Sequence, residues 1–512
     1  MSGHEQPLFE LIERHSKETL RAILRSTPFV PYGADAKAIQ EDIADANSEL
    51  ERLRDEITLA KARVRQLKNL RQPIQSYIKL RGAIFAPIRQ LPTEILLEIF
   101  LIASPSVSIT AIAGFPWKLG HVCGRWRDVA LSSPKLWSYI DLGFPNKHIS
   151  NRRGVQACNV LKLCLTRSGQ HPLSIHLWTH KQNKKITRDI VKIALQVRNR
   201  WKYLQYTSEN WAQTGVSNAL FPPTLNLPML QRLEFAPPRH YRLSIVSPSL
   251  ESLNLKVSSD FSVRALTQAW PRITHLTLTL GSIDPDDFTG TLLQLPELSE
   301  LDIIGLYQCD SSSIPVHLDR LLILRTSLEN PIINNLTTPN VRTLMVDGDF
   351  SRAASSESFP GGHIIADLVQ RSHCSIFHLI LSSYYLEIRD LLGIVGVTPN
   401  VEHLDLLIGL KTELWEHLMY KEDLTPLPRL HTLNLGIVFP YDYQDVVHFV
   451  KSRVSPPSKM EGHGSSPGRL RFLSLRHPRD VKKEKTEIQY LDQLRGFDGL
   501  NFEFYDEPCL AI

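Results

Sequence analysis

The stretch L-E-S-L-N-L (residues 250–255) is one copy of a pattern, L-x-x-L-x-L, that recurs along the chain from residue 230. Its apolar residues alternate over a short run, which is typical of a strand with one buried face. Ten copies carry leucine, or a similar apolar residue, at the three repeated positions. They begin at Leu230, Leu250, Ile273, Leu298, Leu318, Val341, Ile376, Val401, Leu430 and Leu470.

A proline precedes most of these copies by two residues. It is present in seven of them, as Pro228, Pro248, Pro271, Pro296, Pro339, Pro399 and Pro428. Proline fixes an extended entry and cannot donate a hydrogen bond to a strand ladder, so it suits a turn that leads into a short strand. We therefore predict a turn before each strand, and the W-K-Y-L-Q-Y segment at Trp201 is a plausible earlier copy.

The repeat resembles a leucine-rich repeat, because most copies begin 20 to 29 residues apart. The resemblance implies an irregular solenoid over residues 226–512, with the leucines in the core and a curved parallel sheet on the concave side. The asparagine or cysteine that usually follows the last leucine is missing, and Pro238 and Ser258 stand there in the first two copies. An α/β domain whose buried strands happen to share the pattern is the alternative.

In such a solenoid the third and fifth positions of each copy face solvent on the concave side. The candidate binding residues at these positions are Arg232, Glu234, Asn254, His275, Thr277, Glu300, Asp302, Arg320, His403, Asp405, Thr432 and Asn434. They mix both charges with hydroxyls and amides, which suits a protein or peptide better than a phosphate backbone. A small-molecule pocket at the rim stays open as an alternative.

A linking α/β region is predicted for residues 150–225. The apolar residues indicate a helix around 160–165, a strand at 173–177 and an amphipathic helix at 186–197. The second helix has a basic face, composed of Lys184, Lys185, Arg188 and Lys192. We interpret this face as solvated, and nucleic-acid binding through it is an alternative that steep salt dependence would support.

Residues 85–141 indicate three short helices. Pro92 suits a first helical turn, and Leu96, Ile99, Phe100 and Ala103 follow it at the spacing of one helix face. The same spacing predicts a second helix that carries Leu119, Val122, Cys123 and Trp126. Ser133-Pro134 reads as the start of a third. In its helix, Cys123 is expected to be a buried, inert thiol.

This stretch resembles an F-box in its motifs L-P-x-E-I-L at 91–96, I-F at 99–100, V-C-x-x-W-R at 122–127 and L-W at 136–137. It departs from the family in a longer insert at 101–118. The resemblance, to an F-box-like family abundant in fungi, implies binding to the Skp-type adaptor of a cullin–RING ubiquitin ligase. The adaptor contacts it implies are Leu91, Pro92, Ile95, Leu96, Ile99, Phe100, Val122, Cys123, Trp126 and Trp137.

The N-terminal part is expected to be helical, with a short segment at 1–35 and a long helix at 36–80. The long helix has a strict apolar heptad at Ile39, Ile43, Ala46, Leu50, Leu53, Ile57, Ala60, Val64 and Leu67. We expect Pro73 to end or kink it. The stripe could form a coiled-coil homodimer, or the helix could fold back on its own chain.

The composition is that of a globular chain with 42% hydrophobic and 22% charged residues, and a net charge of +5. Six cysteines without a C-x-x-C pair indicate reduced thiols. The uncharged stretch 99–117 contains serines and prolines, so a membrane span is not expected. We found no catalytic, phosphate-binding or metal-binding motif, so neither an enzyme, a cofactor nor a metal is expected.

The fold class expected is therefore α/β, with a long helix, a three-helix F-box and a leucine-rich-repeat-like solenoid. The function expected is that of the substrate-recognition subunit of a Skp–cullin–F-box ubiquitin ligase, in the cytoplasm or nucleus. Its partners would be the adaptor and an unidentified protein substrate, without nucleic acid or membrane. The alternative is a scaffold that assembles proteins through the coiled coil and the solenoid, without ligase association.

Overall fold

The computed structural model describes most of the chain, which divides by packing into two units, residues 1–96 and 97–512. The described residues are 21, 25, 32–104, 106–110, 114–143, 150–179, 184–208, 224–236, 244–257, 270–280, 285–304, 314–328, 330–347, 362–382, 388–407, 412–419, 426–436, 443–454, 469–478 and 485–507. The predicted segment 1–35 thus lies almost wholly outside them. Within these ranges the structure is mixed α/β, as expected, with eleven α-helices and one large parallel sheet. None of those helices combines the length and apolarity that crossing a membrane requires.

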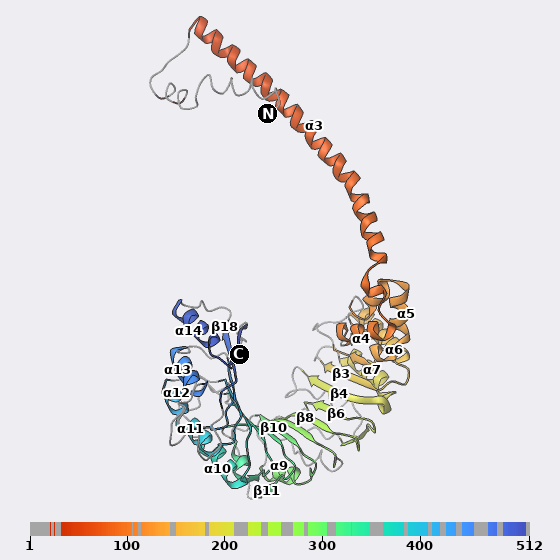
Figure 1. The fold of residues 1–512 in the computed structure, drawn as a ribbon. Coiled ribbons are helices and arrows are strands. Elements are labelled where there is room, and N and C mark those ends of the chain that lie inside the picture. The colour runs from red at the N-terminus through yellow and green to blue at the C-terminus, as the bar shows by residue number, and fades with distance from the viewer. Residues whose placement is uncertain are drawn as a thin grey trace. The chain divides into compact units, whose positions relative to one another are not determined.

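Helix α3 (Ala34–Ile84) forms most of the first unit (Figure 1). It is longer than the predicted 36–80, and the expectation that Pro73 would end or kink it is wrong in one respect, because the helix continues for eleven residues beyond. Proline removes one backbone N–H and so one helical hydrogen bond. The residues around Pro73 are exposed, so water can satisfy the carbonyl that loses its partner.

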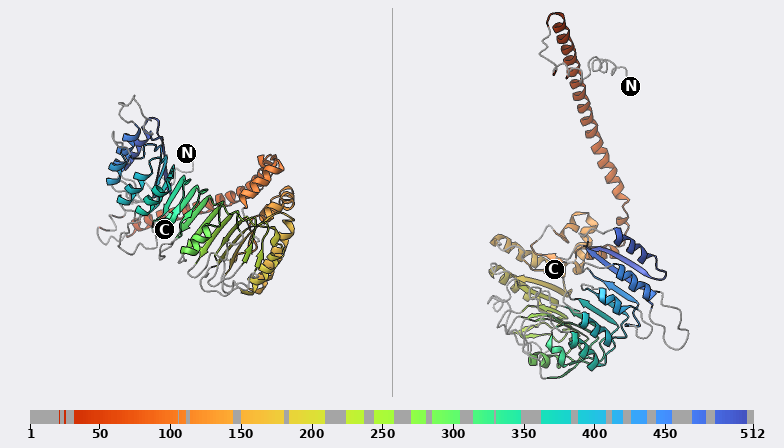
Figure 2. Two further views of the ribbon diagram at one scale, coloured as in Figure 1. Left: turned by 90° about the horizontal axis from the view of Figure 1, so that it is seen from below. Right: turned by 90° about the vertical axis from the view of Figure 1, so that its left-hand side faces the viewer.

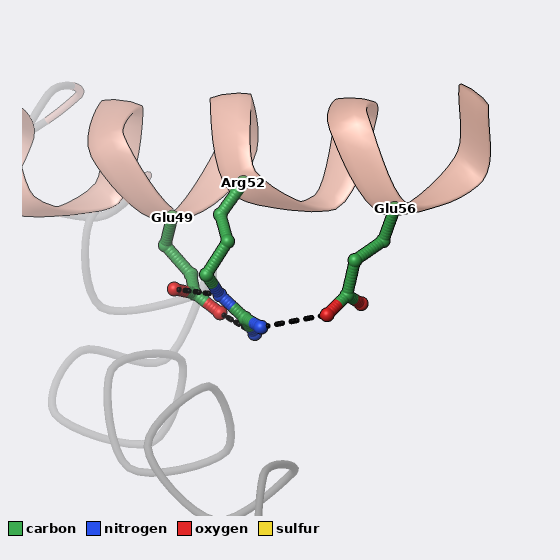
Figure 3. Close-up of polar contacts among 3 residues, drawn as sticks. All are labelled: Glu49, Arg52 and Glu56. Atoms are coloured by element: carbon green, nitrogen blue, oxygen red, sulfur yellow. Dashed lines mark hydrogen bonds and ion pairs between the residues drawn. The ribbon is translucent and has the colours of Figure 1, made fainter. Parts of the chain in front are cut away.

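The heptad stripe of α3 is not covered by the described part of the chain. Ile39, Ile43, Leu50, Ile57, Val64 and Leu67 are all between 44% and 56% exposed. Beside the stripe, Arg52 donates to Glu49 (2.5 Å) and to Glu56 (2.9 Å), as Figure 3 shows. Pairs three and four residues apart support a helix from within, so α3 gains local but not tertiary stabilisation from its described residues.

Residues 86–141 contain short helices and two short strands. They are η1 (Pro87–Arg89), α4 (Thr93–Ala103), β1 (Val107–Ser108), η2 (Trp117–His121), α5 (Gly124–Ser132), η3 (Pro134–Trp137) and β2 (Tyr139–Asp141). Pro92 lies directly before α4 at its start, as predicted for a first helical turn, and its carbonyl accepts from the amide of Leu96 at 3.0 Å. The two strands were not predicted, and they are the first two strands of the large sheet.

The predicted second helix of this segment is in fact two. Helix η2 ends at His121 and α5 begins at Gly124, with Val122 and Cys123 between them. Cys123 has an extended backbone (φ −160°, ψ 171°), so it precedes the helix rather than lying within it. Gly120 and Gly124 flank the break, and glycine is a poor helix former.

Within the described residues the sheet has fifteen strands, and each is parallel to its neighbours in the sheet. After β2 the strands are β3 (Leu173–Thr179), β4 (Trp201–Ser208), β6 (Arg232–Phe235), β8 (Ser252–Val257), β9 (His275–Leu280), β10 (Glu300–Ile304), β12 (Ile323–Ser327), β14 (Thr343–Asp347), β15 (His378–Ser382), β16 (His403–Leu406), β17 (Thr432–Leu435), β18 (Phe472–Pro478) and β19 (Asn501–Glu507). The sheet continues past residues 150 and 226, where boundaries were predicted.

Helices connect many of the strands. They are α6 (Asn151–Arg167), α7 (Lys184–Leu195), η5 (Arg198–Arg200), α9 (Pro285–Leu292), η7 (Pro331–Asn335), α10 (Gly362–Ser372), α11 (Ile388–Val397), α12 (Thr412–Leu418), α13 (Tyr443–Val454) and α14 (Lys485–Arg495). Helix α6, strand β3 and helix α7 match the three elements predicted for the linking region. Within the second unit the strands line the inner side of an arc and the helices its outer side (Figures 1 and 2).

The register of the sheet places equal positions of the repeat side by side. Leu233 of β6 pairs with Leu253 of β8, and Leu253 pairs with Leu276 of β9. The leucine rows are buried, with Leu233 at 0% and Leu253 at 2% exposure. Every alternate side chain therefore enters the core between sheet and helices, and the third and fifth positions remain on the other face of the sheet.

One predicted copy is displaced by three residues. The register pairs Glu300 with Ile323 and Asp302 with Arg325, so the copy starts at Leu321 and not at Leu318. Leu318 instead follows β11 (Val316–His317), which pairs with β13 (Leu336–Thr337) in a separate two-stranded ladder. A second such ladder joins β5 (Thr224–Asn226) and β7 (Ser244–Val246). The run of apolar residues from 321 to 324 fits both registers, and only strand pairing distinguishes them.

Arginines tie helical turns to earlier turns of the second unit. Arg453, 2% exposed in α13, donates to the carbonyls of Leu418, Pro426 and Leu427 at 2.5–3.2 Å. Arg371 of α10 donates in the same way to Ile333 and Leu336. Burial lowers the pKa of Arg453 to about 10. These arginines satisfy backbone carbonyls that would otherwise be buried without partners.

Candidate functional site

The helical segment 97–137 has an aromatic core. The ring of Phe100 lies 4.8 Å from that of Trp126, and the ring of Trp137 lies 4.9 Å from that of Trp117. Trp137 also donates through Nε1 to the carbonyl of Ala130 at 2.7 Å. The guanidinium of Arg167, from α6, lies 4.3 Å over the Trp137 ring. This core holds α4, α5 and η3 in fixed positions relative to one another.

The ten candidate adaptor contacts differ in exposure. Pro92, Ile95, Ile99 and Val122 are exposed, whereas Leu91, Cys123 and Trp126 are half-buried. Leu96, Phe100 and Trp137 are at most 1% exposed, so they are interior residues and not surface contacts, which corrects the prediction for these three. Ile102, which the sequence reasoning missed, is 81% exposed and lies on the same face of α4 as Ile95 and Ile99.

Cys123 differs from its prediction in position. It is half-buried at the residue before α5, rather than on the buried face of a helix. Of the other cysteines, Cys158, Cys164 and Cys374 are also free thiols, and Cys309 and Cys509 lie outside the described residues. Burial raises the pKa of Cys164 to about 12, which makes that thiol a poor nucleophile.

The open face of the sheet, defined by the third and fifth positions of the copies, holds eleven of the twelve predicted concave-face residues, each exposed or half-buried. Arg320 is the exception and needs correction. It lies in the turn before β12, where it forms an ion pair with Glu297. Because that copy starts three residues later, Ile323 and Arg325 take the two places on the open face.

A charged cluster crosses β10, β12 and β14 on the open face. Arg325 donates through Nε to Asp347 at 2.5 Å and lies 3.8 Å from Asp302. Burial raises the pKa of Asp302 to about 6, although Arg325 opposes the shift. One carboxylate oxygen of Asp302 is buried and accepts no hydrogen bond. The cluster therefore holds one arginine between two acids of which only Asp347 is closely paired.

A hollow of about 780 Å³ lies at the beginning of the open face. Its lining includes Lys135, Tyr139, Lys202, Tyr203 and Arg232. Arg232 lies 5.4 Å over the Tyr203 ring and 2.9 Å from Glu234. Burial raises the pKa of both tyrosines, so their hydroxyls stay protonated donors at neutral pH. Cations and phenol donors in one hollow suit an acidic or carbonyl-rich peptide.

Histidines and acids meet on the open face where β15, β16 and β17 begin. His378 Nε2 lies 3.0 Å from Asp405 Oδ2, and Asn434 donates to Asp405 Oδ1 at 2.6 Å. His403 stands beside them, and burial and the neighbouring histidines lower its pKa. Near the middle of the sheet, His275 of β9 lies 3.4 Å from Glu300 of β10. Histidines and acids are thus paired at two places on the face.

The basic face of α7 is placed as expected for a solvated surface. Lys185, Arg188 and Lys192 are exposed, and the side chain of Lys184 lies outside the described part. Asp189 is exposed on the same helix, so the face is not uniformly basic. The face therefore attracts a phosphate backbone less strongly than its four cationic residues would by themselves.

We compared the chain with protein-family models and with curated proteins. No family model matches it, and no curated protein matches it. Function must therefore be argued from the surfaces described above.

Proposed function

We propose that the protein is the substrate-recognition subunit of a Skp–cullin–F-box ubiquitin ligase that acts in the cytoplasm or nucleus. In this proposal residues 85–141 are an F-box that binds the Skp-type adaptor. The sheet-bearing unit is a leucine-rich-repeat-like solenoid whose open face binds a protein target. The proposal rests on the F-box resemblance of the sequence together with the exposure of particular side chains.

The supporting observation is that aliphatic side chains are exposed in the segment that resembles an F-box. Ile99, Ile102 and Val122 are 38%, 81% and 58% exposed, whereas aromatic residues hold the segment together beneath them. Large apolar side chains at the surface of a rigid helical segment favour a partner that covers them. Among partners, the motif resemblance favours the adaptor.

The target surface in this proposal is the open face of the sheet. It carries both charges, hydroxyls, amides and the hollow near Tyr203, and the described helices of the second unit lie on the other side of the sheet (Figure 1). A concave face of this kind contacts a folded or extended protein over many strands. Its mixture of charge suits a protein partner better than a nucleic acid.

The mechanism is one of proximity, without bond chemistry by this chain. Holding the target on the solenoid and the adaptor on the F-box raises the effective concentration of target lysines near a charged conjugating enzyme. The rate gained depends on geometry, so the rigid connection from α4 to β2 through the aromatic core would matter as much as either contact.

We also propose that α3 pairs with a second copy of itself. The support is its strict heptad spacing, which is self-complementary, and the exposure of six apolar residues along it. The ion pairs of Arg52 lie beside this stripe and leave it clear of charge. Such a dimer would present two target-binding faces and two F-boxes.

Adaptor binding tests the main proposal directly. Full-length chain is titrated with a purified Skp-type adaptor by calorimetry, alongside Ile99→Ala plus Val122→Ala. We expect the double variant to lose about 2–4 kcal/mol of binding free energy, roughly 30- to 1,000-fold in affinity. Both side chains are exposed, so the fold should be retained, which circular dichroism checks.

The matched control is Leu293→Ala, which truncates a leucine that is 52% exposed just after α9. It should bind the adaptor like the unmodified chain. Absence of adaptor binding by the unmodified chain would overturn the proposal and favour the scaffold alternative. Equal losses in the control and the double variant would place the adaptor elsewhere on the surface.

A further inference from the structure

Two histidines and a glutamate converge where β16 and β17 begin. Glu402 and His403 are consecutive in the chain, and His431 follows one repeat later. Their nitrogen and carboxylate oxygen atoms all lie within 4.8 Å of one another. All three side chains are half-buried, so the group is reachable from solvent.

The strand register brings the three together. His403 pairs with Thr432, so the residues just before them, Glu402 and His431, are neighbours across the same pair of strands. The amide of His431 donates to the carbonyl of Glu402 at 3.0 Å, and their side chains face each other with Nε2 and Oε2 3.5 Å apart. The His403 ring stands edge-on to that of His431, with centroids 4.7 Å apart.

Neighbouring groups orient the ring of His431. The other nearby histidine and acid, His378 and Asp405, already have partners. The other ring nitrogen of His431, Nδ1, lies 3.1 Å from the hydroxyl of Thr432, which leaves Nε2 directed toward Glu402. A partner on the second nitrogen is how proteins fix a metal-binding imidazole. His378 and Asp405, by contrast, are paired with each other, and Asp405 also accepts from Asn434.

We propose that Glu402, His403 and His431 form a binding site for a divalent transition-metal ion, with Zn²⁺ as the best fit. Two imidazoles and one carboxylate are a known donor set for Zn²⁺ with an open coordination position. Hard ions such as Ca²⁺ and Mg²⁺ prefer oxygen donors alone. Donors on a tetrahedral ion lie about 3.4 Å apart, close to the 3.5 Å that separates His431 and Glu402.

Because all three side chains are half-buried, the open coordination position would be reachable from solvent. The proposed metal site contains no residue of the F-box-like segment 85–141. A failure of adaptor binding would therefore not contradict metal binding, and the reverse also holds.

The test is titration of the full-length chain with Zn²⁺ by calorimetry, and with Co²⁺ followed by visible absorption. We expect an ion bound at this site with imidazole-type Co²⁺ absorption, and no comparable heat with Mg²⁺ or Ca²⁺. His403→Ala and His431→Ala should each weaken Zn²⁺ binding about tenfold or more. Glu402→Gln, which keeps the side-chain volume, should also weaken it.

The matched control is His378→Ala, from the same row of histidines but outside the proposed ligand set. It should bind Zn²⁺ like the unmodified chain. Zn²⁺ binding that survives His403→Ala plus His431→Ala would overturn the proposal, as would its absence from the unmodified chain. If an alanine variant fails to fold, His403→Gln and His431→Gln replace it and carry the same expectation.

Discussion

Helix α3 and the parallel sheet both carry leucine and isoleucine at regular intervals, yet those residues have opposite surroundings. Leu50 and Ile57 of α3 are about half exposed, whereas Leu253 and Leu433 of the sheet are 2% and 0% exposed. In the sheet, each leucine packs against the leucine at the same position of the neighbouring strand and against the helices behind the sheet. The period of the apolar residues therefore determines whether a helix or a strand forms. Their side chains are buried only where another element packs against them.

Charged groups in the two regions differ for the same reason. On α3 the hydrogen bond from Arg52 lowers the pKa of Glu49, because both groups are solvated and the pairing dominates. On the sheet, burial raises the pKa of Asp302 even with Arg325 nearby. An acid beside an arginine therefore has a lowered pKa where both groups are solvated, and a raised pKa where the surrounding structure excludes water.

The largest expected difference between the regions comes from truncating one leucine in each. Leu433→Ala should lower the free energy of unfolding by about 2–5 kcal/mol, because it removes fully buried methyl groups and leaves a cavity. Leu59→Ala, at a 70% exposed position of α3 off the heptad stripe, should change it by less than about 0.5 kcal/mol. Urea unfolding followed by circular dichroism measures both. Equal losses would mean that α3 is as well covered as the sheet.

Removing an arginine from each region should have the next largest effect. Arg453→Ala should lower the free energy of unfolding by about 2–4 kcal/mol, because three buried carbonyls lose their donor. Arg52→Ala, which breaks only solvated ion pairs, should leave the unfolding midpoint unchanged. The same urea experiment measures both. A small effect at Arg453 would show that the carbonyls find other donors.

Introducing charge into the heptad stripe of α3 tests whether a second copy of the chain covers that stripe. Leu50→Asp plus Ile57→Asp should weaken self-association about 100-fold, because two carboxylates would enter an apolar seam. Sedimentation equilibrium across a range of protein concentrations measures it. Leu59→Asp, at a 70% exposed position off the stripe, is the control and should leave the association intact. A monomeric unmodified chain would contradict the proposed pairing.

The smallest expected effect is the pH dependence contributed by Asp302. Its folded-state pKa of about 6 is above the 3.8 of an aspartate in an unfolded chain, so the folded chain holds the proton more tightly. Its stabilising contribution is full below pH 3.8 and is lost as the pH rises through about 6. Asp302→Asn should remove this slope and stabilise the chain at pH 7 by about 1–2 kcal/mol. An unchanged slope of unfolding free energy between those pH values would refute the assignment.

Much of the sheet could be predicted because a period-two apolar pattern directly reports a buried strand face. The strands at 232–235, 252–257 and 403–406 lie where their copies place them. The copy at Leu318 failed because its run of apolar residues fits two registers equally well. Strands β1 and β2 were missed because two- and three-residue strands carry no periodic signal of their own.

The candidate surfaces could be predicted less completely than the elements. Helical spacing separated α4 from its neighbours, but it could not tell the interior Trp137 from the exposed Val122, since both are apolar residues of the motifs in one segment. Ile102 was missed because it falls outside the family motif. Glu402, His403 and His431 have no spacing that signals a metal site, and the arginine contacts to distant carbonyls have no local signature either.

The sequence alone determined the kinds of element and the faces that their apolar residues share, because 2- and 3.6-residue periods follow from backbone geometry. It also determined the strand order, since each copy pairs with the next. The tertiary structure alone decided which apolar side chains stay at the surface, which arginine satisfies which carbonyl, and which polar residues converge. Those outcomes depend on register and on packing between segments far apart in the chain, and no local pattern contains that information.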